Sequence, residues 1–177
     1  MNLQTDRRSQ LRLAMAALCA AGCALLFYTG AGRAQSQPPL EELSAFPQTA
    51  LTITGGSGAS HQFTIWIANT PAREEQGLMF VRELPADKGM VFTGDQPKVW
   101  NMWMKNTFIP LDMLFVAVDG HVVKIAHAIP HDESTVSSDI PVNGIIELQG
   151  GISDKLHIKV GDIAKWKSPG PHNLSGP

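Results

Sequence analysis

The sequence predicts one mainly β domain, a compact barrel-like or sandwich fold of seven or eight short strands with one or two short helices. Two observations predict this class. Apolar and polar residues alternate over many short stretches, and turn-forming Gly, Pro, Asn and Asp residues recur between these stretches at close spacing. The chain has 177 residues, which is room for one ordinary domain.

The first 34 residues do not share this pattern. A basic segment, Arg7–Arg12, precedes an uncharged run over 13–30 that is rich in Ala and Leu, and small residues offer a cleavage site after Ala34. This arrangement is typical of a secretory signal peptide and predicts a periplasmic or secreted protein. An uncleaved segment would instead anchor the chain in the inner membrane, facing the periplasm, because about 18 apolar residues just span a bilayer. Lipidation at Cys23 is a third, less favoured alternative.

Cleavage would change both the cysteine content and the charge of the chain. The two cysteines, Cys19 and Cys23, lie inside the predicted signal, so a mature chain from Gln35 has no disulfide or thiolate. Four of the 14 Lys and Arg residues and one of the 16 Asp and Glu residues are also lost, which leaves a net charge of about −5. This charge argues against nucleic acid and gives no attraction to anionic lipid. Membrane contact is therefore expected only through an uncleaved N-terminal segment.

The remaining chain divides into a linker, a domain and a tail. Residues 35–47 are polar and contain prolines, which predicts a flexible linker. Residues 48–167 carry the strand pattern and form the predicted β domain. The tail over 168–177 is rich in Pro and Gly and is predicted to be disordered.

The first half of the domain begins with two strands around 50–54 and 63–68, joined by a glycine-rich turn. Thr70 and Pro71 then predict the start of a helix, because a hydroxyl N-cap precedes a proline at the first helical position. The helix should end near Met79. A turn over 84–88, a short strand over 89–92 and a turn over 94–98 follow.

Trp100–Asp112 holds two of the four tryptophans and two of the seven methionines within its first five residues. In an extended chain, Trp100, Met102 and Met104 share one face while Trp103 lies on the other. Because both faces are apolar, we expect a central strand that is covered on both sides, with its polar groups at an edge or in a cleft.

The second half of the domain is a series of strands and turns. Asp119-Gly120 is a strong hairpin signal between two apolar stretches. The predicted elements are strands over 111–118, 121–128, 145–149 and 163–166, a loop over 129–141, one or two helical turns over 151–157 and a turn over 160–162.

An ordered series of motifs resembles the DUF192 family, also called UPF0127. It implies a small, mostly β protein, often exported, from a family without an established activity. The resemblance extends over about residues 50–166. The motifs are Gly77-Leu78-Met79-Phe80, Leu84, Gly89-Met90-Val91-Phe92, Trp103-Met104-Lys105-Asn106-Thr107, Pro110-Leu111-Asp112, Asp119-Gly120, Glu147-Leu148, Gly150 and Val160-Gly161-Asp162.

Two departures limit what the resemblance implies. The family often has an arginine directly after its Gly-Leu-Met-aromatic motif, where this chain has Val81 and then Arg82. Many members also carry two cysteines in the loop before the Glu147 strand, whereas residues 130–141 contain none. Disulfide or thiol chemistry therefore cannot be carried over to this chain.

Polar residues of these motifs form a candidate ligand site. Ligand pockets combine apolar walls with a few convergent polar groups, and the motifs supply both. The alternative is structural, because Asn and Thr at a bend satisfy backbone groups and Lys pairs with carboxylates. The candidate residues are Arg73, Arg82, Trp103, Lys105, Asn106, Thr107, Asp112 and Glu147.

A Cu(I) site is a further alternative, because thioethers select Cu(I) and an indole face can cap a cation. The opposing interpretation is that the methionines fill gaps in the core. The candidate copper ligands are Trp100, Met102, Met104, His127 and His131.

Catalytic signals are weak, since neither a nucleophile motif nor a recognisable Ser–His frame is present. Asp112 and Glu147 could act as an acid–base pair of an envelope enzyme on a polar or sugar-like substrate. We favour a monomeric envelope protein that binds a polar ligand or an envelope partner, without a cofactor, over this enzyme and over a periplasmic Cu(I) carrier.

Overall fold

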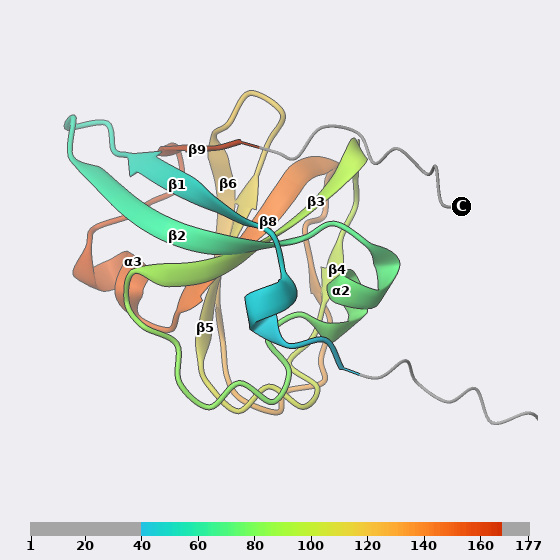
Figure 1. Ribbon diagram of the computed structural model, residues 1–177. Helices are drawn as coiled ribbons and strands as arrows, with labels where there is room; N and C mark the ends of the chain where they lie inside the picture. The colour runs from blue at the N-terminus through green and yellow to red at the C-terminus, as the bar shows by residue number, and fades with distance from the viewer. Residues whose placement is uncertain (1–39, 168–177) are drawn as a thin grey trace, which may run out of the picture. The chain divides into compact units, whose positions relative to one another are not determined.

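The computed structural model describes residues 40–167, which form a mainly β domain as predicted (Figure 1). Seven strands make one sheet, and two two-residue strands pair separately. The strands are β1 (Gln48–Thr54), β2 (Ser60–Ala68), β3 (Lys88–Lys98), β4 (Asn101–Met102), β5 (Leu111–Val116), β6 (Val122–Ala128), β7 (Val136–Ser137), β8 (Val142–Gln149) and β9 (Ile163–Trp166).

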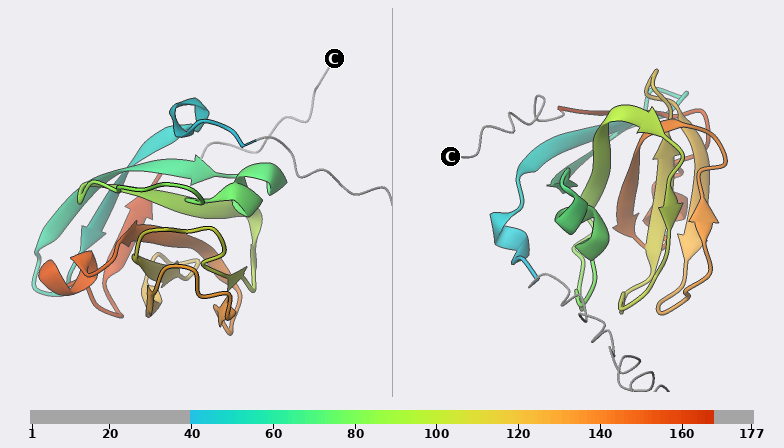
Figure 2. Two further views of the ribbon diagram at one scale, coloured as in Figure 1. Left: turned by 90° about the horizontal axis from the view of Figure 1, so that it is seen from below. Right: turned by 90° about the vertical axis from the view of Figure 1, so that its right-hand side faces the viewer.

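The main sheet has the strand order β6-β5-β8-β3-β2-β1-β9 and curls on itself (Figure 2). Neighbouring strands are antiparallel except β2 and β3, which are parallel and are joined through helix α2 (Pro71–Gln76). A bridge between His121, just before β6, and Ile163 of β9 links the two ends of the sheet. The expected barrel-like architecture is therefore confirmed.

The central strands are apolar on both faces, so the sheet separates two hydrophobic clusters. All six residues of β5 are buried, with Met113 in one cluster and Leu114 in the other. The same alternation occurs in β8, where Ile145 and Ile146 belong to different clusters. The second short helix, α3 (Ile152–Lys155), contributes Ile152 to the cluster that contains Leu114.

Helix α2 begins as the sequence predicts. The Thr70 side chain accepts a hydrogen bond from the Arg73 N–H at 3.3 Å, and Pro71 occupies the first helical position. The helix ends at Gln76, three residues earlier than expected, because Gly77 leaves the helical conformation with φ +48°. A glycine tolerates this left-handed φ at little cost.

The flexible linker predicted over 35–47 is wrong for residues 41–47, which pack on the domain. Phe46 is buried, and the Arg73 guanidinium lies 5.1 Å from the centre of its ring. Glu41 accepts two hydrogen bonds from Arg73, at 2.6 and 2.9 Å, and exchanges two backbone–side-chain bonds with Gln76. The signal or anchor over 1–34 and the tail over 168–177 lie outside the described residues.

The strand expected at Trp100–Asp112, central and covered on both faces, is also wrong in its extent and in its two-sided cover. The turn expected over 94–98 belongs to β3, and between β3 and β5 only Asn101–Met102 forms a strand, paired with β7. The predicted alternation is confirmed: Trp100, Met102 and Met104 are buried, whereas Trp103 is 48% exposed. The segment is therefore a loop with one apolar side.

Across residues 40–167, no helix has the length and apolar character to cross a membrane.

Close approach of β3 and β8 makes Gly89 a sensitive position. A Cβ at Gly89 would lie 2.5 Å from the Glu147 carbonyl oxygen and 2.7 Å from Leu148 Cδ2. We expect Gly89→Ala to lower the free energy of unfolding by about 2–3 kcal/mol, because the added methyl group would overpack the space between β3 and β8. Gly56→Ala is the matched control, since nothing lies within 4 Å of its added Cβ. Urea unfolding of both variants measures the difference, and equal losses would contradict the argument.

Candidate functional site

Glu147 is a buried carboxylate in the middle of the sheet. It lies on β8 between Met90 of β3 and Met113 of β5, both of which are fully buried. Its side chain is 4% exposed, and its Oε2 atom has no hydrogen-bond partner. Burial raises the pKa of Glu147 to about 8, because the ionised form loses its hydration without gaining a partner. Such a group is neutral in most molecules at pH 7.

A cavity of about 50 Å³ adjoins Glu147. It brings together three residues of the predicted ligand site, namely Trp103, Thr107 and Glu147. The other lining residues come from α2 and the motif after it, from β3 and from β4. They are Glu74, Glu75, Gln76, Gly77, Leu78, Met79, Phe92, Asn101 and Met102.

Three loops meet beside this cavity, each with a non-glycine residue in the left-handed region. These residues are Phe80 (φ 65°), Asn106 (φ 55°) and His131 (φ 62°). The Phe80 N–H donates to the Asn106 carbonyl oxygen at 2.9 Å, and the His131 N–H donates to that of Thr107 at 3.2 Å. Strained backbone of this kind persists where the surroundings fix it, and it is concentrated at functional sites.

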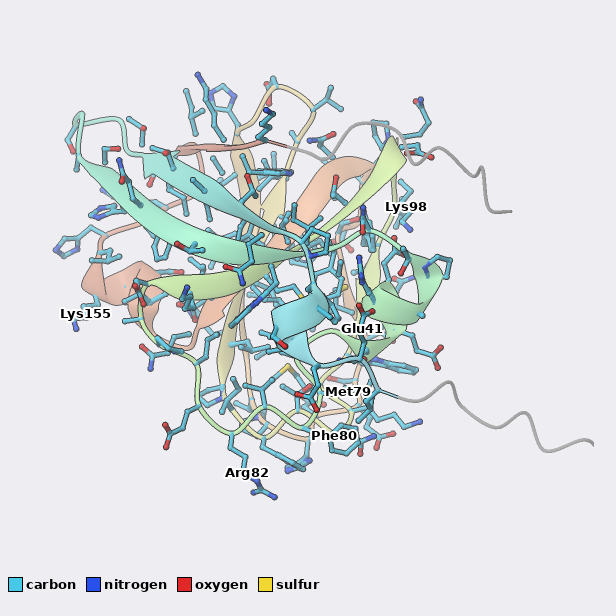
Figure 3. All side chains as sticks on the ribbon, in the orientation of Figure 1. Glu41, Met79, Phe80, Arg82, Lys98 and Lys155 are labelled. Atoms are coloured by element: carbon cyan, nitrogen blue, oxygen red, sulfur yellow. The ribbon has the colours of Figure 1, made fainter. Side chains whose placement is uncertain are left out.

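The same loops expose aromatic side chains. Phe80 is 44% exposed and packs edge-on against Phe108, with ring centres 5.9 Å apart, and Phe108 also contacts His131. Lys105 Nζ lies 5.4 Å from the centre of the Trp103 ring. Figure 3 shows Met79 and Phe80 side by side at one end of the domain. We call these two groups of side chains, Phe80 with Phe108 and His131, and Trp103 with Lys105, the aromatic rim.

Asp112 has a structural environment instead. Its buried carboxylate accepts hydrogen bonds from the N–H groups of Gly151 and Ser153, at 3.0 and 2.8 Å, and bonds to His127 Nδ1 at 2.8 Å. Burial alone would raise the pKa of Asp112, but these hydrogen bonds outweigh it and lower the pKa below its ordinary value. The Asp112 hydrogen bond raises the pKa of His127, against the smaller effect of burial. Asp112 therefore ties β5 to the start of α3 and to β6.

Asp112 and Glu147 cannot form the predicted acid–base pair. In the β5–β8 ladder Glu147 is opposite Met113, and Asp112 is opposite Leu148. Residues directly opposite share a face, and successive residues alternate, so the two carboxylates project from opposite faces of the sheet. One substrate cannot reach both.

The basic residues of the predicted site do not line the cavity. Arg73 is engaged by Glu41, as described above. Arg82 lies 4.9 Å from the centre of the Phe108 ring and borders a separate hollow of about 410 Å³ beside Pro110 and Gly150. Lys105 stays partly exposed on the rim, and Asn106 shapes its loop through its backbone.

The copper set is divided between the core and the surface. Trp100, Met102 and Met104 are in one hydrophobic cluster, and Lys98 Nζ already lies 3.7 Å from the centre of the Trp100 ring. The exposed His127 and His131 contact Asp112 and Phe108 instead. No three His, Cys, Asp or Glu residues within 40–167 are grouped as a metal site would need.

Sequence reasoning missed the wall of the cavity that follows α2. Met79 and Phe92 belong to the motifs Gly77-Leu78-Met79-Phe80 and Gly89-Met90-Val91-Phe92, which were used only to recognise the family. Glu74 and Glu75 of α2 line the same cavity as Glu147. Their position beside Glu147 depends on the parallel β2–β3 crossover, which no local pattern specifies.

The fold and cavity define a small barrel-like β domain with one buried acid beside a small hollow. A family model described as "Uncharacterized ACR", DUF192, matches residues 52–166. The chain belongs to the DUF192 family.

Two crystal structures resemble this chain. One is of a protein from Sinorhizobium meliloti 1021 for which a role as transcription regulator has been suggested; it is 37% identical, covers 68% of this chain and 95% of its own, and gives a TM-score of 0.67. The other is of a protein of unknown function from Novosphingobium aromaticivorans DSM 12444. It is 38% identical, the match covers 75% of this chain and 94% of the other, and the TM-score is 0.67. Among proteins with curated descriptions, none matches this chain.

The raised pKa of Glu147 predicts a pH-dependent stability. Between about pH 4.5 and pH 8 the unfolded chain ionises this carboxyl while the folded chain keeps its proton, so stability falls as pH rises. Glu147→Gln removes this dependence. We expect the free energy of unfolding of the variant to exceed that of the unmodified protein by a margin that grows by about 1 kcal/mol per pH unit in this window. His127, whose raised pKa acts in the same direction at higher pH, is common to both proteins and cancels. Urea unfolding from pH 5 to pH 9 measures this difference in the free energy of unfolding, with Glu75→Gln as the exposed control. A difference that does not change with pH would contradict the raised pKa of Glu147.

The left-handed Asn106 supplies a third stability prediction. Asn106→Ala should lower the free energy of unfolding by about 1 kcal/mol, because a Cβ without a local polar group is disfavoured at this φ. Asn106→Gly should change the free energy of unfolding little, since glycine adopts positive φ freely. Thermal melts of both variants provide the comparison. Equal losses would show that the Asn106 side chain, and not its backbone, holds the loops together.

Proposed function

We propose that this chain is an exported binding module that holds the polar end of a small ligand in the Glu147 cavity. The observation that carries the proposal is the buried Glu147 carboxyl with an unpaired oxygen beside a cavity. Leaving a buried polar atom unpaired costs about 1–3 kcal/mol, so natural proteins rarely keep one without a use. A ligand that enters the cavity would supply the missing partner.

The surroundings of Glu147 support ligand binding. Apolar walls from Leu78, Met79, Phe92 and Met102 combine with a few polar groups, which is the usual composition of small-molecule sites. The aromatic rim beside the cavity exposes rings to solvent at Phe80 and Trp103. The cavity would take the end of the ligand, and the rim would contact the remainder.

The envelope location is part of the proposal and is supported by the sequence. A basic segment followed by an uncharged run of about 18 residues and a small-residue cleavage site is the pattern of an export signal. The cysteine-free domain is compatible with an oxidising compartment, because it has no thiol that could form a wrong disulfide.

The function suggested for the Sinorhizobium relative is not proposed for this chain. Residues 40–167 contain 10 Lys and Arg residues against 15 Asp and Glu residues. Nucleic-acid binding requires a basic surface that neutralises phosphates, and this balance opposes it.

A cavity-filling variant tests the proposal. Met79→Trp should fill the Glu147 cavity from a partly exposed wall position, whereas Met79→Leu should leave it open. Purified protein is incubated with a small-molecule extract of bacterial envelopes and examined by native mass spectrometry. We expect an added mass on the unmodified protein and on Met79→Leu, and at least tenfold less on Met79→Trp. The same added mass on all three proteins would place binding elsewhere, and no added mass would contradict the proposal.

A further inference from the structure

We propose that the ligand end recognised in the Glu147 cavity is a primary ammonium group. This inference rests on the proposed function and adds the chemical class of the ligand. Its starting point is the charge of the cavity lining. Three of the twelve lining residues are glutamates, Glu74, Glu75 and Glu147, and none is Lys, Arg or His.

The lining is therefore complementary to a cation. Lys98 bonds to Glu74 at 3.0 Å and offsets one of the three acids. Glu75 and Glu147 have no ion-pair partner among residues 40–167, although Glu75 is exposed to solvent. A cation that reaches Glu147 would pair with a carboxylate shielded from water, where the attraction is far stronger than at the surface.

The chain's own lysines already use this surface. Lys98 bonds to the lining residue Glu74, and Lys105 lies over the ring of the lining residue Trp103. Neither lysine lines the cavity itself, so the position beside Glu147 is left for an external group. Two ammonium groups on the outside of one cavity show that its walls accept this chemistry.

The cavity size selects among cations. Its volume of about 50 Å³ is far below the roughly 300–1,000 Å³ of usual ligand pockets, so only a small head group fits. An ammonium with its first methylene is such a group. A guanidinium or a quaternary ammonium is larger, and its bulky or planar head would not enter. The rest of an alkylammonium chain would pass along Met79 and Trp103, which line the cavity and are both partly exposed.

Ion pairing at Glu147 also requires a proton to leave. Burial raises the pKa of the Glu147 carboxyl to about 8 and so favours its neutral form, whereas an ammonium binds best to the ionised form. The other titratable groups on the surrounding elements are Glu74 and Glu75 of α2, Lys98 of β3, and Lys105 and His131 of the rim. Of these groups and Glu147, only Glu147 is buried away from water, so Glu147 is the group that exchanges a proton on binding.

A titration with n-butylammonium chloride tests the inference. Binding is followed by ¹H–¹⁵N NMR at pH 8, where we expect saturable shifts at the backbone amides around Glu147, Trp103 and Thr107, with a Kd in the millimolar range for so small a probe. Glu147→Gln should weaken binding at least tenfold, and the control Glu83→Gln, at an exposed glutamate outside this cavity, less than threefold. Lowering the pH from 8 to 6 should weaken binding to the unmodified protein by at least tenfold, because a proton must then be displaced.

Two further probes separate charge from size. We expect 1-butanol to bind at least tenfold more weakly than n-butylammonium, because it lacks the charge, and tetramethylammonium to give no shifts at these amides, because it is too large. Equal binding of 1-butanol, unchanged binding by Glu147→Gln, or no shifts at about 50 mM n-butylammonium would each overturn the inference. An uncharged ligand found in the envelope extract and excluded by Met79→Trp would overturn this inference while the proposed function stands.

Discussion

The two-sided burial of the central strands β5 and β8 determines what surrounds the two acids that they carry. β5 and β8 pair with each other and are covered by apolar clusters on both faces, so a polar side chain on either strand must find a partner inside the protein or remain unpaired. Asp112 and Glu147 are on these strands, and their side chains project from opposite faces of the sheet. Their environments differ because the neighbouring residues on the two faces differ.

Asp112 meets hydrogen-bond donors. The chain turns back over it after β8, and the N–H groups of Gly151 and Ser153 point at its carboxylate, while His127 reaches it from β6. The Asp112 carboxylate therefore stays ionised and helps to fix α3 on the sheet. Glu147 meets methionines and aromatic rings instead, and its unpaired oxygen adjoins a cavity. The same residue class thus acts as a structural tie on one face and, in our proposal, as a recognition group on the other.

The elements of the fold followed from local chemistry that the sequence displays. Thr70-Pro71 predicted the start of α2 because a cap and a fixed φ act within one turn. Asp119-Gly120 predicted the β5–β6 hairpin because its turn places Gly120 at a positive φ, which glycine adopts freely. The strand predicted over Trp100–Asp112 was wrong because buried and exposed residues do alternate there, but they do so in a loop. That loop is held by β7 and by a hydrogen bond from the Met104 N–H to the Asp132 carbonyl oxygen, and this partner lies 28 residues away in the sequence. Contacts at such separation leave no local pattern.

The candidate site was predicted in part for the same reason. Trp103, Thr107 and Glu147 were selected as polar or aromatic members of recognised motifs, and the structure brings them to one cavity. Arg73 and Asp112 were selected on equal grounds and belong elsewhere, because strand register and helix position decide which motif residues converge. The left-handed Phe80 could not be identified beforehand, since phenylalanine does not favour positive φ.

A buried neutral glutamic acid is a costly choice if its only task is to fill space. Glutamine has nearly the same shape and no ionised form, so it would remove the loss of stability that Glu147 causes as the pH rises toward 8. The carboxyl differs from the amide in one useful respect, because it can release a proton and become a shielded anion. An ammonium that enters the cavity would exploit this difference, and the free energy of binding would offset the cost of ionising the group. The destabilising effect of Glu147 in the empty protein and its affinity for a cation thus have the same physical origin, as expected where function is favoured over stability.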